Sequence, residues 1–148
     1  MLATVLIGTI AALPIPSLAF QVYQGTSEEG SIVGMEHNDS SMWVSDDLSV
    51  IYYDKPKAAL AGTVTRGTVL YQGDPIPRAE GQRISGTAFT FRKGCAPAPY
   101  PVTGELRGNI LTLRGASPRR EQNGCAVIGY TEDSGNAVLV FQYNYGDI

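Results

Sequence analysis

Short runs in which apolar and polar residues alternate recur along the chain from about residue 42 onward, and glycine- and proline-rich turns separate them. Runs with this two-residue period are typical of β-strands that bury one face. The expected strands cover residues 42–44, 48–53, 67–73, 82–93, 100–106, 110–114, 125–130 and 137–143. Because almost no helical periodicity accompanies them, the pattern predicts an all-β domain.

The connections between these runs are mostly of hairpin length, which favours a single antiparallel up-and-down β-barrel, with a β-sandwich as the alternative. Residues 57–66 are interpreted as a crossing loop and residues 115–124 as a basic loop. The runs 125–130 and 137–143 are expected to pair across the turn at 132–136. Gly86, inside the run 82–93, suggests a bend or bulge in that strand.

The N-terminal residues 1–19 are apolar, carry no charged side chain and end in Ser17-Leu18-Ala19. The small residues Ser17 and Ala19 are typical of a signal peptide that is cleaved before Phe20. A transmembrane anchor is the alternative, but the run is short and proline interrupts it at Pro14 and Pro16. We therefore expect a signal peptide at 1–19, a loosely structured arm at 20–41 and a β-barrel domain at 42–148.

The chain contains two cysteines, Cys95 and Cys125. No CxxC spacing or neighbouring histidine indicates a metal or redox site, so a structural disulfide is the interpretation. Such a bond forms in an oxidising compartment, which agrees with export to the periplasm or the medium.

The composition argues against several classes of function. The net charge is −3 with mixed signs, whereas nucleic-acid binding favours a strongly basic domain. The single histidine, His37, lies in a polar segment and is expected to be an exposed loop residue. The sequence has no GxSxG elbow and no set of zinc ligands, so we expect no catalytic residue, no metal and no cofactor. Glu105 is the one acid on a predicted strand with aromatic residues nearby.

Binding is the favoured activity. Aromatic side chains such as Trp43, Tyr53 and Tyr100 present flat apolar faces with polar groups, which suit pockets and interfaces, although packing in the core is the alternative. Arg119 and Arg120 stand near the second cysteine. With the further basic residues Arg92, Lys93 and Arg114, they would form a cationic patch at the disulfide, and a solvated loop is the alternative.

Several motifs follow one another between Met42 and Phe141: IYY-x-KP, GT-x-L-Y-x-G, I-S-G-T-A-x-x-F, C-x-P-x-x-Y-x-V-x-G and L-x-G-x-x-P. This stretch resembles small exported bacterial β-domains of unassigned function, so the resemblance implies export and fold but no activity.

The predicted architecture is also similar to that of calycins and periplasmic lysozyme inhibitors. The Ser-Gly-x-x-Tyr loop of the inhibitors would correspond to a segment that begins at Ser85 and Gly86, with Phe89 in place of the tyrosine. Their Tyr-x-x-x-Lys element would correspond to Tyr53 and Lys57.

Together these features predict a non-catalytic exported module that binds an envelope or extracellular protein, or a small ligand. An inhibitor of a lysozyme-type hydrolase and a small-ligand carrier are the alternatives. We expect no nucleic-acid partner and no membrane span in the mature form.

Overall fold

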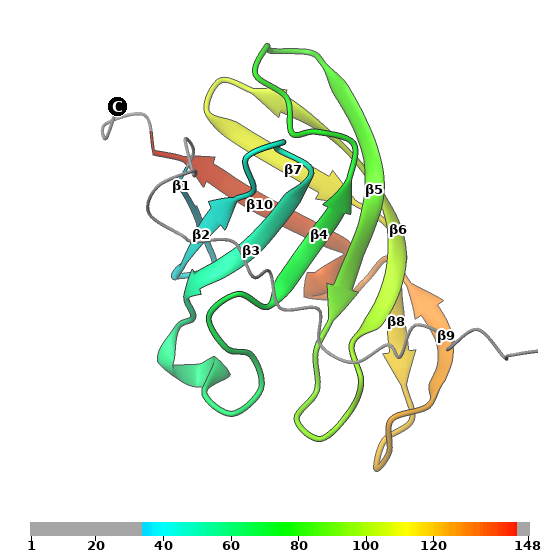
Figure 1. Cartoon of the computed structure of the whole chain (residues 1–148). Helices are drawn as coiled ribbons and strands as arrows, with labels where there is room; N and C mark the ends of the chain where they lie inside the picture. The colour runs from blue at the N-terminus through cyan, green and yellow to red at the C-terminus, as the bar shows by residue number, and fades with distance from the viewer. Residues whose placement is uncertain (1–33, 145–148) are drawn as a thin grey trace, which may run out of the picture.

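Eight antiparallel strands close into a barrel in the computed structural model, which describes residues 34–144 (Figure 1). The barrel strands are β1 (Gly34–His37), β2 (Ser40–Val44), β3 (Val50–Lys55), β4 (Val69–Gly73), β5 (Arg83–Thr90), β6 (Ala98–Arg107), β7 (Ile110–Arg114) and β10 (Val138–Tyr143). A separate hairpin consists of β8 (Ser117–Arg120) and β9 (Val127–Thr131), and two 3₁₀ turns are η1 (Ala58–Leu60) and η2 (Gly135–Ala137).

The strand order confirms the predicted up-and-down barrel. Each strand from β1 to β7 pairs with the next strand in sequence, and β10 closes the barrel between β7 and β1. The one interruption is the β8–β9 hairpin, which leaves the wall after β7 and projects from one end of the barrel (Figure 1).

The prediction for the last part of the chain was wrong in two respects. Residues 115–124 are not simply a loop, because they contain β8, and β9 pairs with β8 rather than with β10. The side chains explain this pairing. In β10 every second residue is buried, with Leu139, Phe141 and Tyr143 inside, whereas no residue of β9 is buried. A barrel wall needs one buried face, so β10 closes the barrel and β9 remains outside.

The barrel begins before residue 42. The strand β1 and the first residues of β2 fall within the range 20–41, for which a loosely structured arm was predicted. Asn38 and Asp39 join them, and both have positive φ angles of 45° and 67°. A two-residue turn with both residues in this region matches the twist of a β-hairpin. Residues 1–33, which include the predicted signal peptide, lie outside the described residues.

Large side chains fill the inside of the barrel. The residues that are no more than 1% exposed include Met35, Met42, Val44, Ile51, Tyr71, Ala88, Tyr100, Leu111, Leu113 and Phe141. An eight-stranded barrel is just wide enough for its side chains to fill it. The described interior is therefore a packed core and not a chamber.

Gly86 contributes to this packing, and of the bend or bulge predicted there, the bulge is absent. It lies opposite Gly73 in β4 and Val102 in β6, and neither ladder of β5 shifts register. A Cβ atom on Gly86 would lie 2.5 Å from a ring carbon of Tyr71. Glycine at this position therefore allows the Tyr71 ring to cross the inner face of β5 at close range.

The two ends of the barrel differ. At one end the β4–β5 loop folds inward, with Ile76 in the core and the Tyr143 hydroxyl donating to the carbonyl of Pro77 at 3.1 Å. The opposite end, which we call the disulfide end, carries the β1–β2 turn, the η1 loop, the β5–β6 loop and the β8–β9 hairpin (Figure 1).

Candidate functional site

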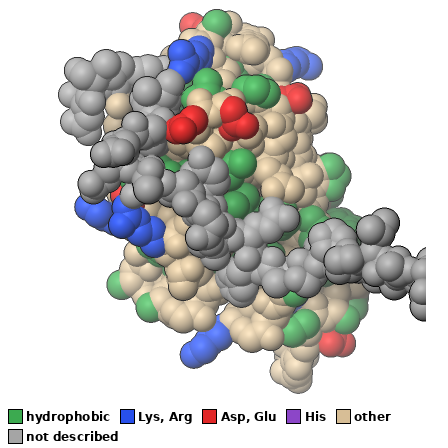
Figure 2. Space-filling view, viewed as in Figure 1, with side chains coloured by type: hydrophobic (Ala, Val, Ile, Leu, Met, Phe, Trp, Pro, Cys, Tyr) green, Lys and Arg blue, Asp and Glu red, His purple; other side chains and the backbone are tan. Residues whose placement is uncertain are grey.

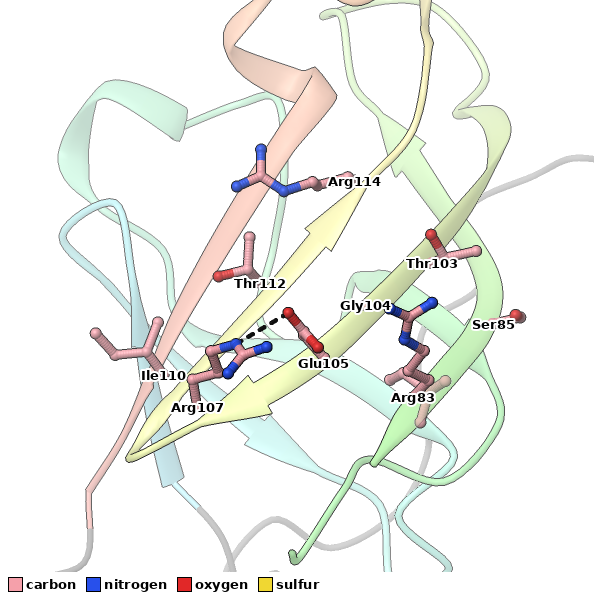
Figure 3. A pocket seen from close by; sticks show the side chains of 10 residues that line it. Arg83, Ser85, Thr103, Gly104, Glu105, Arg107, Ile110, Thr112 and Arg114 are labelled. Carbon is pink, nitrogen blue, oxygen red and sulfur yellow. Dashed lines mark hydrogen bonds and ion pairs between the residues drawn. The ribbon is translucent and has the colours of Figure 1, made fainter. Parts of the chain in front are cut away.

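A groove of about 720 Å³ crosses the outer wall of the barrel over β5, β6 and β7 (Figure 3). We call it the outer groove. Its lining residues are Arg83, Ile84, Ser85, Thr103, Gly104, Glu105, Arg107, Ile110, Thr112 and Arg114.

Strand register brings the polar residues of the groove together. Arg83 pairs with Glu105, which pairs in turn with Thr112. In the next row Ser85, Thr103 and Arg114 lie side by side. Neighbouring strands lie about 4.8 Å apart, so each row presents three side chains within roughly 10 Å on the outer face.

Gly104, which lies between the two polar rows, allows close packing on the inner face of the wall beneath the groove. A Cβ atom on Gly104 would lie 2.4 Å from Cδ2 of Leu113 and 2.5 Å from the carbonyl oxygen of Thr112. The strands β6 and β7 therefore approach each other more closely here than a side chain would allow.

The electrostatics of the groove favour an anionic ligand. Three arginines and one glutamate line it, although the whole chain has a net charge of −3. Arg107 Nε donates to Glu105 Oε1 at 3.1 Å. Within residues 34–144, neither Arg83 nor Arg114 has an ion-pair partner. Their guanidinium groups therefore remain available to carboxylate or phosphate oxygens. By contrast, Figure 2 shows no broad area of one charge sign on the described part of the face that it views.

The predicted disulfide is present and lies at the disulfide end of the barrel. Cys95 in the β5–β6 loop and Cys125 at the tip of the β8–β9 hairpin are bonded, with Cα atoms 5.4 Å apart. The bond joins a barrel loop to the projecting hairpin. A disulfide is typical of proteins that fold in an oxidising compartment outside the cytosol.

Two arginines of the predicted cationic patch fix the same corner of the structure. Arg92 Nη1 donates to the carbonyls of Glu121 and Gly124, at 2.8 and 2.6 Å. Arg120 Nη2 donates to the carbonyl of Ala96 at 2.7 Å. Partial burial, together with the charge of Arg92, lowers the pKa of Arg120. These guanidinium groups hold backbone atoms, so the patch at the disulfide offers less free charge than the sequence suggested.

The other basic residues of that predicted patch separate. Arg114 lies in the outer groove, whereas Arg119 is exposed on β8 opposite Gly129. Lys93 remains beside the disulfide and lines a shallow depression there. The structure therefore brings Arg92, Lys93 and Arg120 together and places Arg114 elsewhere.

The aromatic candidates occupy different environments. Tyr53 and Tyr100 are buried at the disulfide end, and the Tyr100 hydroxyl donates to the carbonyl of Asn136. Burial raises the pKa of Tyr53 to about 12 and raises that of Tyr100 as well. Trp43 is half-buried on the outer side of β2, against Gly34 of β1. Tyr53 and Lys57 line one small pocket at this end.

Ser85 and Gly86, which the inhibitor resemblance placed on a loop, lie within β5, where Ser85 pairs with β6 and Gly86 pairs with both β4 and β6. The Ser85 amide donates to Asp74 Oδ2 at 2.9 Å, and its side chain faces the outer groove. Gly86 faces the core. Neighbouring residues of one strand therefore serve opposite faces of the wall.

His37 is buried, contrary to the expectation of an exposed loop residue. Its Nδ1 donates to the carbonyl of Val140 at 2.8 Å, and its ring stacks on Phe141 with centroids 4.6 Å apart. Burial, with a smaller effect of Lys57, lowers the pKa of His37 and favours the neutral ring. The residue belongs to β1, which the sequence interpretation did not recognise as a strand, so its inward side was missed.

Several groove residues were not recognised as a site in the sequence. Arg83, Arg107 and Thr112 received no role, although each occupies an outward position in a strand. The available signal was the polar residue at every second position of three consecutive runs. What the sequence does not contain is the register that aligns them.

No group of three or more His, Cys, Asp or Glu side chains within residues 34–144 is arranged to hold a metal ion. None of the helical segments in that part of the chain is long and apolar enough to cross a membrane.

Comparisons of the chain with protein-family models, with curated proteins and with solved structures found no match.

Proposed function

We propose that the protein is a non-catalytic exported module that binds an anionic segment of an envelope or extracellular macromolecule in the outer groove. The observation that carries the proposal is the cluster of three arginines around the groove, in an acidic chain. Two of them, Arg83 and Arg114, have no ion-pair partner in the described part of the protein. The hydroxyl groups of Ser85, Thr103 and Thr112 add further hydrogen-bond donors.

The shape of the groove supports an extended ligand. The groove lies on a sheet face and crosses three strands, so a linear chain can lie along it and meet several arginines in turn (Figure 3). Each exposed ion pair contributes only about 0.2–1 kcal/mol. Useful affinity therefore requires several charges on one chain, which favours a polymer over a single small anion.

Other observations support a role in binding rather than catalysis. Glu105 is the one carboxylate that lines the groove among the described residues, and Arg107 holds it in an ion pair. His37 is enclosed between the Val140 carbonyl and the Phe141 ring. The disulfide supports periplasmic or secreted localisation.

The two alternatives receive less support. A lysozyme-type inhibitor of the resembled family would present Ser85 and Gly86 on a loop, and both lie within β5. A carrier with a ligand inside the barrel would need interior space, which Tyr71, Tyr100 and Phe141 occupy.

Binding to two model polymers tests the proposal. Polygalacturonate and poly-L-glutamate carry carboxylates on a sugar and on a peptide chain, so they distinguish the two sources of anionic ligand. Replacing both Arg83 and Arg114 with glutamine should weaken binding to the preferred polymer about tenfold. Binding should also weaken as salt increases, because salt screens exposed charges.

The matched control replaces Lys55 and Arg78, which are exposed outside the groove, with glutamine. It removes the same charge and should change affinity much less. Equal losses in the two double variants would show attraction to total charge and would refute the groove as the site. The absence of binding to both polymers at low salt would also refute it.

A further inference from the structure

A second cavity of about 180 Å³ lies at the disulfide end of the barrel and shares no lining residue with the outer groove. We call it the end pocket. It lies between the β1–β2 turn, the η1 loop and the ends of β3, β5 and β10. The lining residues that matter here are Tyr53, Lys57, Thr90, Phe91, Asn136 and Leu139.

The first observation is an unpartnered hydroxyl group. Among the described residues, Thr90 Oγ1 is the buried side-chain polar atom that lacks a hydrogen-bond partner. Thr90 is 7% exposed and lines the end pocket. Buried polar groups in native proteins almost always have hydrogen-bond partners. An unpartnered hydroxyl group on a residue that lines a cavity therefore suggests that a molecule bound in the cavity supplies the hydrogen bond.

The second observation is the charge of the pocket. Lys57 is the one Lys or Arg side chain in its lining, and no Asp or Glu lines it. His37, which also lines the pocket, is favoured in its neutral form because burial lowers its pKa. The lining of the pocket therefore combines a positive charge without an acidic partner and a residue, Thr90, whose buried hydroxyl group has no hydrogen-bond partner.

The third observation is the apolar wall. The rings of Tyr53 and Phe91 meet edge to face with centroids 6.3 Å apart, and Leu139 lies nearby in the lining. The volume is well below the roughly 300–1,000 Å³ of sites for drug-sized ligands. An occupant must therefore be small, and part of it must be apolar.

From these features we infer that the end pocket binds a small organic carboxylate, such as a single-ring or short-chain acid. The carboxylate would accept hydrogen bonds from the Lys57 ammonium group and the Thr90 hydroxyl. Its apolar body would pack against Tyr53 and Phe91. The inference goes beyond the proposed function, because it concerns a different face, different residues and a ligand of a different size.

The test is an NMR titration of the isotope-labelled protein with benzoate, with benzamide as its neutral counterpart and acetate as a carboxylate without the ring. Benzoate should produce saturable shifts of the Lys57, Thr90 and Phe91 amides. Benzamide and acetate should bind more weakly, because each lacks one of the two features. The absence of saturable shifts with benzoate at about 10 mM, near the weak limit of specific binding, would overturn the inference.

Two substitutions locate the site. Lys57→Gln and Thr90→Val should each weaken benzoate binding by about tenfold, since each removes one hydrogen bond to a charged group. Lys55→Gln removes an exposed lysine two residues away and should leave the affinity unchanged. An equal loss in Lys55→Gln would overturn the inference.

Thr90→Val also has a readout without ligand. Replacing an unpartnered buried hydroxyl with a methyl group of the same shape should raise the melting temperature of the free protein. Thr90→Ser keeps the hydroxyl and should retain benzoate binding. If Thr90→Val lowered both the stability and the affinity while Thr90→Ser lowered them equally, the hydroxyl would have no role in binding and the inference would be wrong.

Discussion

Removing the disulfide should destabilise the whole barrel and not only the hairpin that it holds. The bond joins Cys95 to Cys125 across 30 residues of sequence, and this loop contains the barrel strands β6 and β7. In the chain-entropy model, cross-linking a loop of this length lowers the conformational entropy of the unfolded chain by about 12 cal/mol/K, which corresponds to a stabilisation of about 3.6 kcal/mol at 25 °C. Replacing both cysteines with alanine should therefore lower the free energy of unfolding by about 3–4 kcal/mol.

The local contacts do not change this expectation greatly. Cys125 is exposed and Cys95 is buried, so the double substitution removes little more than one buried sulfur from the folded state. The hydrogen bonds of Arg92 and Arg120 to backbone carbonyls remain and still connect the hairpin to the β5–β6 loop. The folded structure should therefore persist, and the loss should come chiefly from the freer unfolded chain.

The measurement is equilibrium unfolding in urea of the oxidised protein and the Cys95→Ala/Cys125→Ala variant. The variant should show the lower free energy of unfolding, a steeper dependence on urea because its unfolded state exposes more surface, and a melting temperature lower by roughly 15 °C.

A loss below about 1 kcal/mol, with an unchanged urea dependence, would refute the reasoning. That result would mean that the unfolded state is already compact around this loop. A variant that keeps its barrel but loses amide-exchange protection in β8 and β9 would show instead that the disulfide stabilises the hairpin alone.

Three further predictions concern the barrel wall and the loop between β2 and β3. Gly86→Ala should lower the free energy of unfolding by about 2–3 kcal/mol through overpacking, because the added Cβ atom would lie 2.5 Å from the ring of Tyr71. Gly129→Ala is the control and should leave the stability nearly unchanged, because no atom lies within 4 Å of its Cβ position. Thermal unfolding of both variants is the measurement. Hydrogen bonds, with those from Ser49 largest, lower the pKa of Asp47 from 3.8 to about 2, so the stability that these bonds contribute is present above pH 4 and is lost as the pH falls towards 2. An NMR titration should give that midpoint, and Ser49→Ala should raise it. Glu105→Gln should tighten polyanion binding several-fold, and weaker binding would show that this carboxylate positions the groove.

The sequence predicted the barrel because its main signals are local. Alternation along β10, for example, gives buried Leu139 and Phe141 and exposed Val138 and Val140, as a wall strand requires. The disulfide was predicted from the two cysteines together with the expected signal peptide. The strand β1 was missed because its four residues give only two inward positions, Met35 and His37.

The candidate site was less predictable, because it depends on register. Outward polar residues on three strands form one groove only if the strands align. The strand register that sets Arg83 opposite Glu105 depends on the tertiary structure and cannot be deduced from either strand alone. The end pocket shows the same limit. Tyr53 and Lys57 were named from a motif, but the unpartnered state of Thr90 depends on every atom around it.

The packed interior explains where binding chemistry can reside in this fold. Tyr71 and Phe141 are fully buried, and the hydroxyl of Tyr71 donates to the carbonyl of Asp74 at 2.9 Å. The side chains of the inner face therefore stabilise the fold and are not accessible to a ligand. Outward positions such as Arg83 and Arg114 contact little of that core. Substitutions there should alter ligand binding while leaving the free energy of unfolding within about 0.5 kcal/mol. Under the two proposals, changes of ligand specificity would therefore arise at the outer wall and the disulfide end, with the core unchanged.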